Sequence, residues 1–487
     1  MPERGPRKGG DPIIPAPPKD AVAFLSAAEL LARYRRRELS PVEVVRAVLD
    51  RIDRHNGAVN AWCHLDAEGA LCSAKESEAR WLAGTPKGLA DGVPVGIKDN
   101  ILVAGMPARF GSRLTSSDPA PHDGPSVARL REQGAIIIGK TTLPEIGWKA
   151  VADSPLTGIT RNPWDTRMTP GGSSAGAVAA VVLGMGVIHL GTDGGGSIRI
   201  PASFTGCYGL KPTRARVPAW PASPLGTLAH AGPLTRTVAD AALALTIIGA
   251  PDERDVYAWT SPAPDFRVGL DDGVAGLRVA YSPRLGYAKR VDPEVEAAVA
   301  AAARVFAGLG AHVEEADPEI GGDPVAPWDT LWWSSAAFNL QPHGERARAL
   351  ADPDLVAKAA QGLSISAIDF IRAQLKRAEL HNAFARFHQR YDLLLTPSMP
   401  LPAFEVGHLM PPSGDWGDTW TNWSPFSYPF NLTQQPAASI PCGLTRAGLP
   451  IGLQIVGALG ADALVLRASR AFEAARSFGF LDAPRVK

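Results

Sequence analysis

The sequence predicts an α/β fold built on a mixed, largely parallel sheet. Two observations support this prediction: short apolar runs end in polar or glycine-rich turns, and helical patterns separate most of these runs. Buried strands that alternate with helices are typical of α/β folds. With 487 residues, the chain can also bury a large core. The expected strands are residues 92–98, 135–140, 187–193, 277–281, 311–315 and 393–396.

Two helices are predicted near the start of the ordered chain. Ser26 is followed three residues later by Glu29, and Ser40 by Glu43, each ahead of apolar residues at helical spacing. This is the pattern of a capping box, in which the serine and the acidic side chain each satisfy a free backbone N–H group. Pro41 fits the first turn of the second helix, where no backbone donor is needed.

A later helix is predicted over residues 293–309. Asp292 and Pro293 provide a start that is typical of helices, because proline suits the first helical turn. Gly308 and Gly310 provide the end, because glycine readily adopts the backbone conformation that closes a helix.

The domain organisation is expected to be simple. Residues 1–22 are basic and rich in proline and glycine, and they lack the apolar core of a secretory signal, so we expect a disordered tail. Residues 23–487 contain no obvious linker and are expected to form a single domain. Within it, residues 250–430 lack glycine–serine motifs and are a candidate cap or substrate-pocket lobe.

The charge balance argues against nucleic acid and membrane partners. The chain has 49 Lys and Arg and 49 Asp and Glu residues, so its formal net charge of +0 gives no overall field for a polyanion. The longest stretch of small apolar residues, 176–191, falls short of the ~20 residues that span a bilayer. We therefore expect a soluble protein with a small-molecule ligand.

Cysteine and histidine patterns argue against disulfides and metals. The four cysteines show no C-x-x-C spacing, which indicates a reducing, cytoplasmic compartment. The ten histidines form no H-E-x-x-H motif and no tight cluster with cysteine, so no metal site is expected. The cysteines are Cys63, Cys72, Cys207 and Cys442.

A glycine-rich loop follows the strand expected at 187–193. Three successive glycines, Gly194, Gly195 and Gly196, lead to Ser197. Glycine backbones reach conformations that other residues avoid, and can point several N–H groups into one concavity. The loop is therefore a candidate oxyanion hole. The alternative is a phosphate cradle, although no Lys-Ser or Lys-Thr pair follows this loop.

Residues 169–176, TPGGSSAG, form a second glycine–serine cluster. It contains a formal G-x-S-x-G match centred on Ser174, which suggests a nucleophile elbow. An elbow must follow a central strand, which Pro163 and Pro170 exclude, so we interpret the match as accidental. In another interpretation, the small residues only let a helix pack closely, because an apolar helical pattern continues to Val182.

Lys98 ends the apolar run at 92–98. Burial of an unpaired cation is costly, and it lowers the pKa of a lysine and leaves a neutral amine that can accept a proton. The alternative is a buried ion pair with the neighbouring Asp99. Together, Lys98, Ser173 and Ser197 offer the base, relay and nucleophile that acyl transfer from an amide requires.

The order of three segments, GVPVGIKDN, TPGGSSAG and GTDGGGSIRIPASFTGCYGLKPT, resembles that of the amidase signature family. The segment PCGLTRAGLPIGLQIVG resembles the closing strand region of the same family, and the likeness spans residues 25–475. The resemblance implies an α/β/α sandwich around the mixed sheet and hydrolysis of carboxylic amides without a metal or organic cofactor. It also implies that a homodimer is a reasonable expectation.

The resemblance further implies a Ser–cis-Ser–Lys triad. Ser197 would be the nucleophile, and its backbone N–H group would join the oxyanion hole. Ser173, the first serine of its pair, would be the relay and would follow a cis peptide bond. Lys98 would be the base. The proton of Ser197 would pass to Ser173 as Ser173 passes its own proton to the neutral amine.

The loop around the nucleophile has two implied functions. The backbone N–H groups of Gly194, Gly195 and Gly196 would form most of the oxyanion hole. Asp193 and Arg199 flank the nucleophile and would form an ion pair that supports the loop.

Two segments, residues 328–338 and 416–430, are rich in aromatic side chains. One interpretation is core packing or a subunit interface. The other is an apolar pocket wall, which suits a bulky uncharged ligand. The candidate pocket residues are Met106, Trp148, Trp332, Trp420 and Phe426.

Three functions are consistent with these patterns. The first is an amidase that hydrolyses bulky hydrophobic or aryl amides, with ester or carbamate hydrolysis as a side activity. The second is the glutaminase (A-type) subunit of a tRNA-dependent amidotransferase, which the aromatic segments disfavour because glutamine requires a polar pocket. The third is a non-catalytic nucleotide-binding protein that uses the glycine-rich loop as a phosphate cradle.

Overall fold

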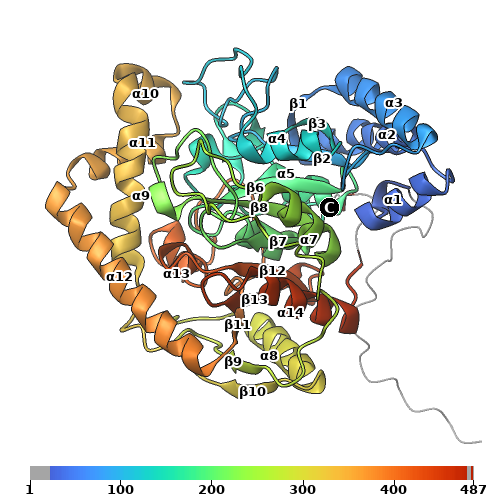
Figure 1. Ribbon diagram of the computed structural model, residues 1–487. Helices are drawn as coiled ribbons and strands as arrows, with labels where there is room; N and C mark the ends of the chain where they lie inside the picture. Colours follow the sequence, from blue (N-terminus) through green and yellow to red (C-terminus); the bar gives the residue numbers. More distant parts are fainter. Residues whose placement is uncertain (1–21, 480–483, 486–487) are drawn as a thin grey trace, which may run out of the picture.

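The computed structural model describes residues 22–479 and 484–485, and its centre is a mixed sheet of 11 strands (Figure 1). A separate small sheet pairs β4 (Asp153–Ser154) with β5 (Gly158–Ile159). The large sheet consists of β1 (Trp62–Leu65), β2 (Pro94–Lys98), β3 (Ile136–Thr141), β6 (Ile188–Asp193), β7 (Tyr208–Lys211), β8 (His230–Thr235), β9 (Arg278–Tyr281), β10 (His312–Glu315), β11 (Leu393–Pro397), β12 (Ala437–Leu444) and β13 (Pro450–Gly457). Their order is β1-β3-β2-β6-β8-β7-β12-β13-β11-β9-β10.

Parallel pairing occurs in two groups of strands. β2 pairs in parallel with β3 and β6, and β9 with β10 and β11. The strands between these groups are antiparallel; β12 and β13, for example, are joined by residues 445–449, a connection too short for a parallel crossover. The predicted α/β fold with a mixed sheet is confirmed. Each apolar run that was predicted to be a strand overlaps one.

Helices pack on the sheet in two groups. One group contains α5 and α6, which contact each other. The other contains α14, which contacts both α7 and α8. This second group lies in front of the strands in Figure 1. The helices are α1 (Ala27–Arg35), α2 (Pro41–Val59), α3 (Ala67–Ala83), α4 (Pro125–Glu132), α5 (Ala175–Val182), α6 (Arg199–Thr205), α7 (Val238–Ile248), α8 (Pro293–Gly308), α9 (Val325–Leu340), α10 (Glu345–Leu350), α11 (Pro353–Leu363), α12 (Ala367–Arg390), α13 (Pro429–Leu432) and α14 (Asp462–Ala475).

The local signals in the sequence form as predicted. The capping boxes of Ser26 and Ser40 are both present at the starts of α1 and α2. Asp292 caps α8, which ends at Gly308, one residue before the predicted boundary. These patterns are reliable because a cap satisfies backbone N–H groups within a single helical turn.

The centre of the sheet places the glycine–serine clusters beside Lys98. β2 and β6 are parallel neighbours, so their carboxyl ends, Lys98 and Asp193, lie at the same edge of the sheet. α5 begins at Ala175, at the end of one glycine–serine cluster, α6 begins at Arg199, two residues after Ser197, and the two helices contact each other. The carboxyl edge of an open α/β sheet is where such folds usually bind ligands.

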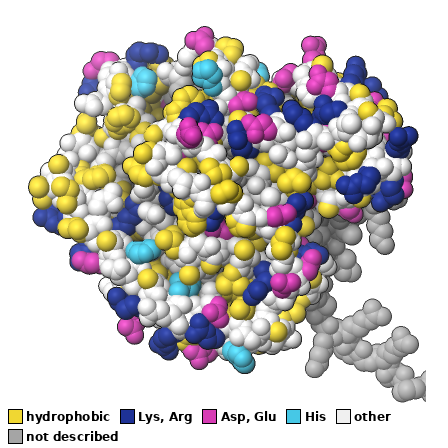
Figure 2. Space-filling view, viewed as in Figure 1, with side chains coloured by type: hydrophobic (Ala, Val, Ile, Leu, Met, Phe, Trp, Pro, Cys, Tyr) yellow, Lys and Arg dark blue, Asp and Glu magenta, His cyan; other side chains and the backbone are white. Residues whose placement is uncertain are grey.

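Residues 250–430, the predicted lobe, include β9, β10 and β11 of the central sheet as well as α9–α12, which lie together at the left of Figure 1. Its role as a cap stays a prediction. The prediction of a disordered tail lies outside the described residues except for Val22, which begins a short 3₁₀ helix. Within residues 22–479 and 484–485, every helix is too short or too polar to cross a bilayer. Figure 2 shows Lys, Arg, Asp and Glu side chains interspersed over one face, as the charge balance suggests.

Candidate active site

Lys98 stands at the end of β2 with no exposed surface. Its Nζ atom donates hydrogen bonds to Ser173 Oγ at 2.7 Å, Ser174 Oγ at 3.0 Å and Thr192 Oγ1 at 2.9 Å. These hydroxyl groups, and the Thr192 carbonyl oxygen at 3.4 Å, are all neutral, and neutral acceptors stabilise an ammonium ion less than a carboxylate does.

The alternative of an ion pair between Lys98 and Asp99 is wrong. Asp99 Oδ1 lies 3.2 Å from Lys140 Nζ, and both of these side chains are buried. Successive side chains along a strand point to opposite faces, which explains why neighbours in the sequence have different partners. Lys98 is therefore left with neutral hydrogen-bond partners.

Burial controls the charge of Lys98. Desolvation lowers the pKa of Lys98 to about 7, and the negative charge of Asp193 partly opposes this shift. The side chain is therefore partly neutral at neutral pH, and a neutral amine can accept a proton.

Ser173 and the Ser197 loop are brought together beside Lys98. The peptide bond between Gly172 and Ser173 is cis, as the family resemblance implied. Ser173 is buried, and the backbone N–H of Ser174 donates to the carbonyl oxygen of Ser197 at 3.1 Å. The three segments that the sequence singled out thus meet at one edge of the sheet.

The carbonyl groups of the glycine-rich loop are held by side chains from distant segments. The carbonyl oxygens of Asp193, Gly194 and Gly195 each accept a side-chain hydrogen bond. In this order, the donors are Asn431 Nδ2 at 3.0 Å, Trp328 Nε1 at 3.2 Å and Ser427 Oγ at 2.7 Å. Because a trans peptide group points its C=O and N–H in opposite directions, each of these bonds also orients the following N–H group.

The N–H groups of the loop are not equivalent. Gly196 N–H donates to Asp193 Oδ1 at 2.7 Å, so in this structure it is already occupied. Within the described residues, the N–H groups of Gly194, Gly195 and Ser197 have no acceptor. The sequence led us to expect N–H donors from all three glycines. In this structure, only the N–H groups of Gly194, Gly195 and Ser197 are available to an oxyanion.

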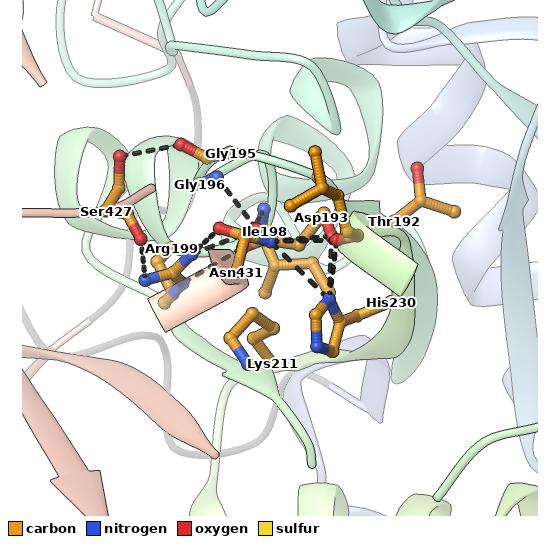
Figure 3. A network of polar contacts seen from close by, with 12 residues as sticks. Thr192, Asp193, Gly195, Gly196, Ile198, Arg199, Lys211, His230, Ser427 and Asn431 are labelled. Atoms are coloured by element: carbon orange, nitrogen blue, oxygen red, sulfur yellow. Dashed lines mark hydrogen bonds and ion pairs between the residues drawn. The ribbon is translucent and has the colours of Figure 1, made fainter. Parts of the chain in front are cut away.

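A buried ion pair lies under the loop (Figure 3). Arg199 Nη2 lies 3.0 Å from Asp193 Oδ1, and neither side chain is exposed. Burial raises the pKa of the Asp193 carboxyl, but the charge of Arg199 outweighs this effect and holds the pKa well below its ordinary value. Arg199 also donates to Asn431 Oδ1 at 2.7 Å and to Gln454 Oε1 at 2.9 Å. The network connects the loop to α13 and β13.

Two of the predicted pocket residues lie beside these segments. A Cβ atom built on Gly194 would lie 2.7 Å from Trp332 Cζ3, so the ring packs directly on the loop. Trp332 Nε1 donates to the carbonyl oxygen of Trp148 at 3.1 Å. Trp148 follows Gly147, where an added Cβ would lie 3.0 Å from Ser173 Oγ.

The other predicted pocket residues differ in their surroundings. Trp420 packs edge-on against Trp332, with ring centroids 6.0 Å apart. Met106 is buried in the turn from which the Arg109 N–H donates to Asp99. Phe426 has no exposed surface and belongs to the hydrophobic core, and its role as a pocket residue stays a prediction.

Sequence reasoning missed several residues of the site. Thr192 could have been found, because it precedes Asp193 at the end of a strand that leads into the loop. Ser427, Asn431 and Trp328 lie more than 130 positions from their partners in the loop, and no local pattern connects them. No group of His, Cys, Asp and Glu among the described residues is arranged to hold a metal ion.

Known proteins match the chain over most of its length. Residues 43–466 match the family model described as Amidase. The chain is 37% identical to the A-type subunit of the glutamyl-tRNA(Gln) amidotransferase of Myxococcus xanthus, over 94% of the chain and 99% of the relative. It is 36% identical to an acylamidase of Rhodococcus erythropolis, over 93% and 96%. The solved structure of a bacterial aryl acylamidase of the amidase signature enzymes matches with a TM-score of 0.87 and 31% identity, over 94% and 97%.

Proposed function

Because the chain belongs to the amidase signature family, and is thus a hydrolase of amide carbon–nitrogen bonds, we propose that it is a stand-alone amidase with Ser197 as its nucleophile. The observation that carries the proposal is the hydrogen bond between Lys98 Nζ and Ser173 Oγ, at 2.7 Å. It connects a buried amine, whose pKa is lowered to about 7, to a serine beside the glycine-rich loop. Such a pair can accept the proton of a nucleophile.

The proposed reaction begins with the attack of Ser197 Oγ on the amide carbonyl carbon. The proton of Ser197 passes to Ser173, and the proton of Ser173 passes to the neutral amine of Lys98. The substrate carbonyl oxygen becomes an oxyanion and accepts hydrogen bonds from the backbone N–H groups of Gly194, Gly195 and Ser197. These N–H groups are suited to this role because no group in the described chain accepts them.

The second half of the reaction reverses the relay. The C–N bond breaks as Ser173 returns a proton to the departing nitrogen, which leaves an ester between the acyl group and Ser197. A water molecule then gives a proton to the relay and attacks the ester. The acyl group leaves as a carboxylic acid, and Ser197 recovers its proton.

We propose bulky hydrophobic or aryl amides as the substrate class, with esters and carbamates as further substrates of the same nucleophile. The support is the aromatic ring of Trp332, which packs against Gly194. An apolar wall at this position favours an uncharged group next to the reacting carbonyl. Two relatives are described as an acylamidase and an aryl acylamidase.

A second candidate function is the glutaminase component of an amidotransferase. It is favoured by the match to the A-type subunit of a glutamyl-tRNA(Gln) amidotransferase, which covers 99% of that relative. The aromatic side chains argue against it, because glutamine carries an ammonium and a carboxylate group that need polar or charged partners.

Turnover measurements distinguish the two functions. The purified protein would be assayed with glutamine, short aliphatic amides, aryl anilides and aryl carbamates, with the Ser197→Ala variant as control. Rapid hydrolysis of anilides that the variant lacks would support the stand-alone amidase. Activity on glutamine alone, and only with added partner subunits, would support the glutaminase. Full anilide turnover by Ser197→Ala would refute the assignment of the nucleophile.

A further inference from the structure

We propose that Trp328, on α9, is a positioning residue that fixes the oxyanion hole by holding the Gly194 carbonyl group. The inference rests on the proposed function, because it assigns a role within the same site. Trp328 has no exposed surface, so it acts through the loop and not on the substrate. Because α9 lies within residues 250–430, this role connects the candidate lobe to the proposed reaction.

The direction of one N–H group follows from a single hydrogen bond. Trp328 Nε1 donates to the carbonyl oxygen of Gly194 at 3.2 Å. The peptide group between Gly194 and Gly195 is planar and trans, so its N–H points away from its C=O. The N–H of Gly195 is therefore directed away from the indole, and no acceptor in the described chain takes it.

This peptide group needs an anchor because glycines lie on both sides of it. Glycine has few steric limits, so a peptide group between two glycines can rotate at low cost. The next peptide group is held at both ends, since Gly195 O accepts from Ser427 Oγ and Gly196 N–H donates to Asp193. The indole of Trp328 holds the preceding peptide group, between Gly194 and Gly195, through the Gly194 carbonyl oxygen.

The indole is itself held firmly in place. Its ring stacks on Trp332 with centroids 4.5 Å apart, and it meets Trp420 edge-on at 5.2 Å. Tyr428 lies against it with centroids 5.8 Å apart. A Cβ atom built on Gly195 would lie 2.6 Å from Trp328 Cζ2, so the ring touches the loop backbone. The N–H of the indole therefore has little freedom to turn away from Gly194.

The test replaces only the N–H group of the indole. β-(3-Benzothienyl)alanine has nearly the shape of tryptophan, with sulfur in place of N–H, and would be incorporated at position 328. The same replacement at Trp333 is the matched control, because Trp333 lies on the same helix and packs edge-on against Trp328. For each protein, kcat and KM for an aryl anilide and the inhibition constant of phenylboronic acid would be measured. Phenylboronic acid forms a tetrahedral adduct with a nucleophilic serine and therefore probes the oxyanion hole.

At position 328 we expect kcat to fall about 10²-fold, with KM changed by less than about threefold, because the loss concerns alignment of a transition-state donor. The inhibition constant of phenylboronic acid should rise in parallel, and the Trp333 replacement should leave all three values near wild type. An unchanged kcat at position 328, or equal losses at both positions, would overturn the inference. If Ser197→Ala is inactive while the position-328 protein is unaffected, only this inference fails; if Ser197→Ala is active, the proposed function fails.

Discussion

Lys98 Nζ lies 2.7 Å from Ser173 Oγ, and both side chains are buried at the carboxyl edge of the central sheet. Asp99, the carboxylate next to Lys98 in the sequence, pairs with Lys140 instead. This separation leaves the Lys98 amine with only neutral hydrogen-bond partners, so that burial rather than an ion pair determines its charge.

The activity should therefore depend on the protonation of Lys98. Burial lowers the pKa of Lys98 to about 7. Below this pH the amine is protonated and cannot accept a proton, so kcat/KM should fall as the pH decreases and level off on the alkaline side. The profile would be measured from pH 5 to 9 with a neutral anilide. A flat profile over this range would contradict the role of Lys98 as base.

The two adjacent serines should differ sharply when each is replaced by alanine. Both accept a hydrogen bond from Lys98, at 2.7 Å for Ser173 and 3.0 Å for Ser174. Ser173→Ala removes the proposed proton relay and should lower kcat about 10²–10⁴-fold. Ser174→Ala removes a supporting hydrogen bond and should cost only about tenfold. Steady-state kinetics on both variants would check this, and equal losses would count against Ser173 as the relay.

The buried pair of Asp193 and Arg199 should be essential for stability. Asp193→Asn leaves the guanidinium charge buried without its carboxylate, which should cost about 3–5 kcal/mol. The control is Asp265→Asn, in an exposed pair with Arg267, where the loss should be ~0.2–1 kcal/mol. Denaturant unfolding would compare the two variants. Similar losses for both would show that the buried pair has no special role.

The same pair should make stability sensitive to acid. The pKa of the Asp193 carboxyl is held well below its ordinary value, so its stabilising effect is present above the unfolded pKa of about 4. It is lost as the pH falls further towards the folded pKa. Unfolding measured from pH 7 down to pH 3 should show a smaller loss for Asp193→Asn than for the wild-type protein.

The loop should tolerate no side chain at position 195. A Cβ atom there would lie 2.6 Å from Trp328 Cζ2, so either the ring or the loop must move. Gly195→Ala should therefore lower kcat about 10²-fold through misplaced N–H donors. Gly57→Ala, where nothing lies within 4 Å, should leave kcat unchanged and stabilise α2 by about 0.5–1 kcal/mol. Anilide kinetics and thermal melting would test the pair, and normal turnover by Gly195→Ala would be the contrary result.

Much of the fold could be predicted because its signals are local. The apolar runs that became β2 and β6 each end in a polar turn, and the capping boxes lie within a few residues. β7 and β8 were not recognised in the same way. β7 contains no Val, Ile or Thr, and β8 has only Thr235 at its end together with a glycine and a proline, so the residues most typical of strands are scarce in both.

The candidate site could be predicted only in part, for the same reason. Lys98, Ser173 and Ser197 lie in distinctive segments, whereas the partners that orient the loop come from far along the chain. Ser427, for example, is 232 positions from the glycine whose carbonyl it holds. The pattern of three glycines could not show that the N–H of Gly196 is occupied by Asp193, because this depends on the folded conformation of the loop.

The proposed mechanism is tested most sharply by looking for an acyl group on Ser197. The protein would be mixed with an aryl ester or anilide and quenched in acid within milliseconds to seconds, and its intact mass and peptide masses would be measured. We expect a mass increase equal to the acyl group, located on the peptide that contains Ser197 and absent from Ser197→Ala. Turnover without such an adduct on the wild-type protein, or an adduct on another residue, would show that Ser197 is not the nucleophile.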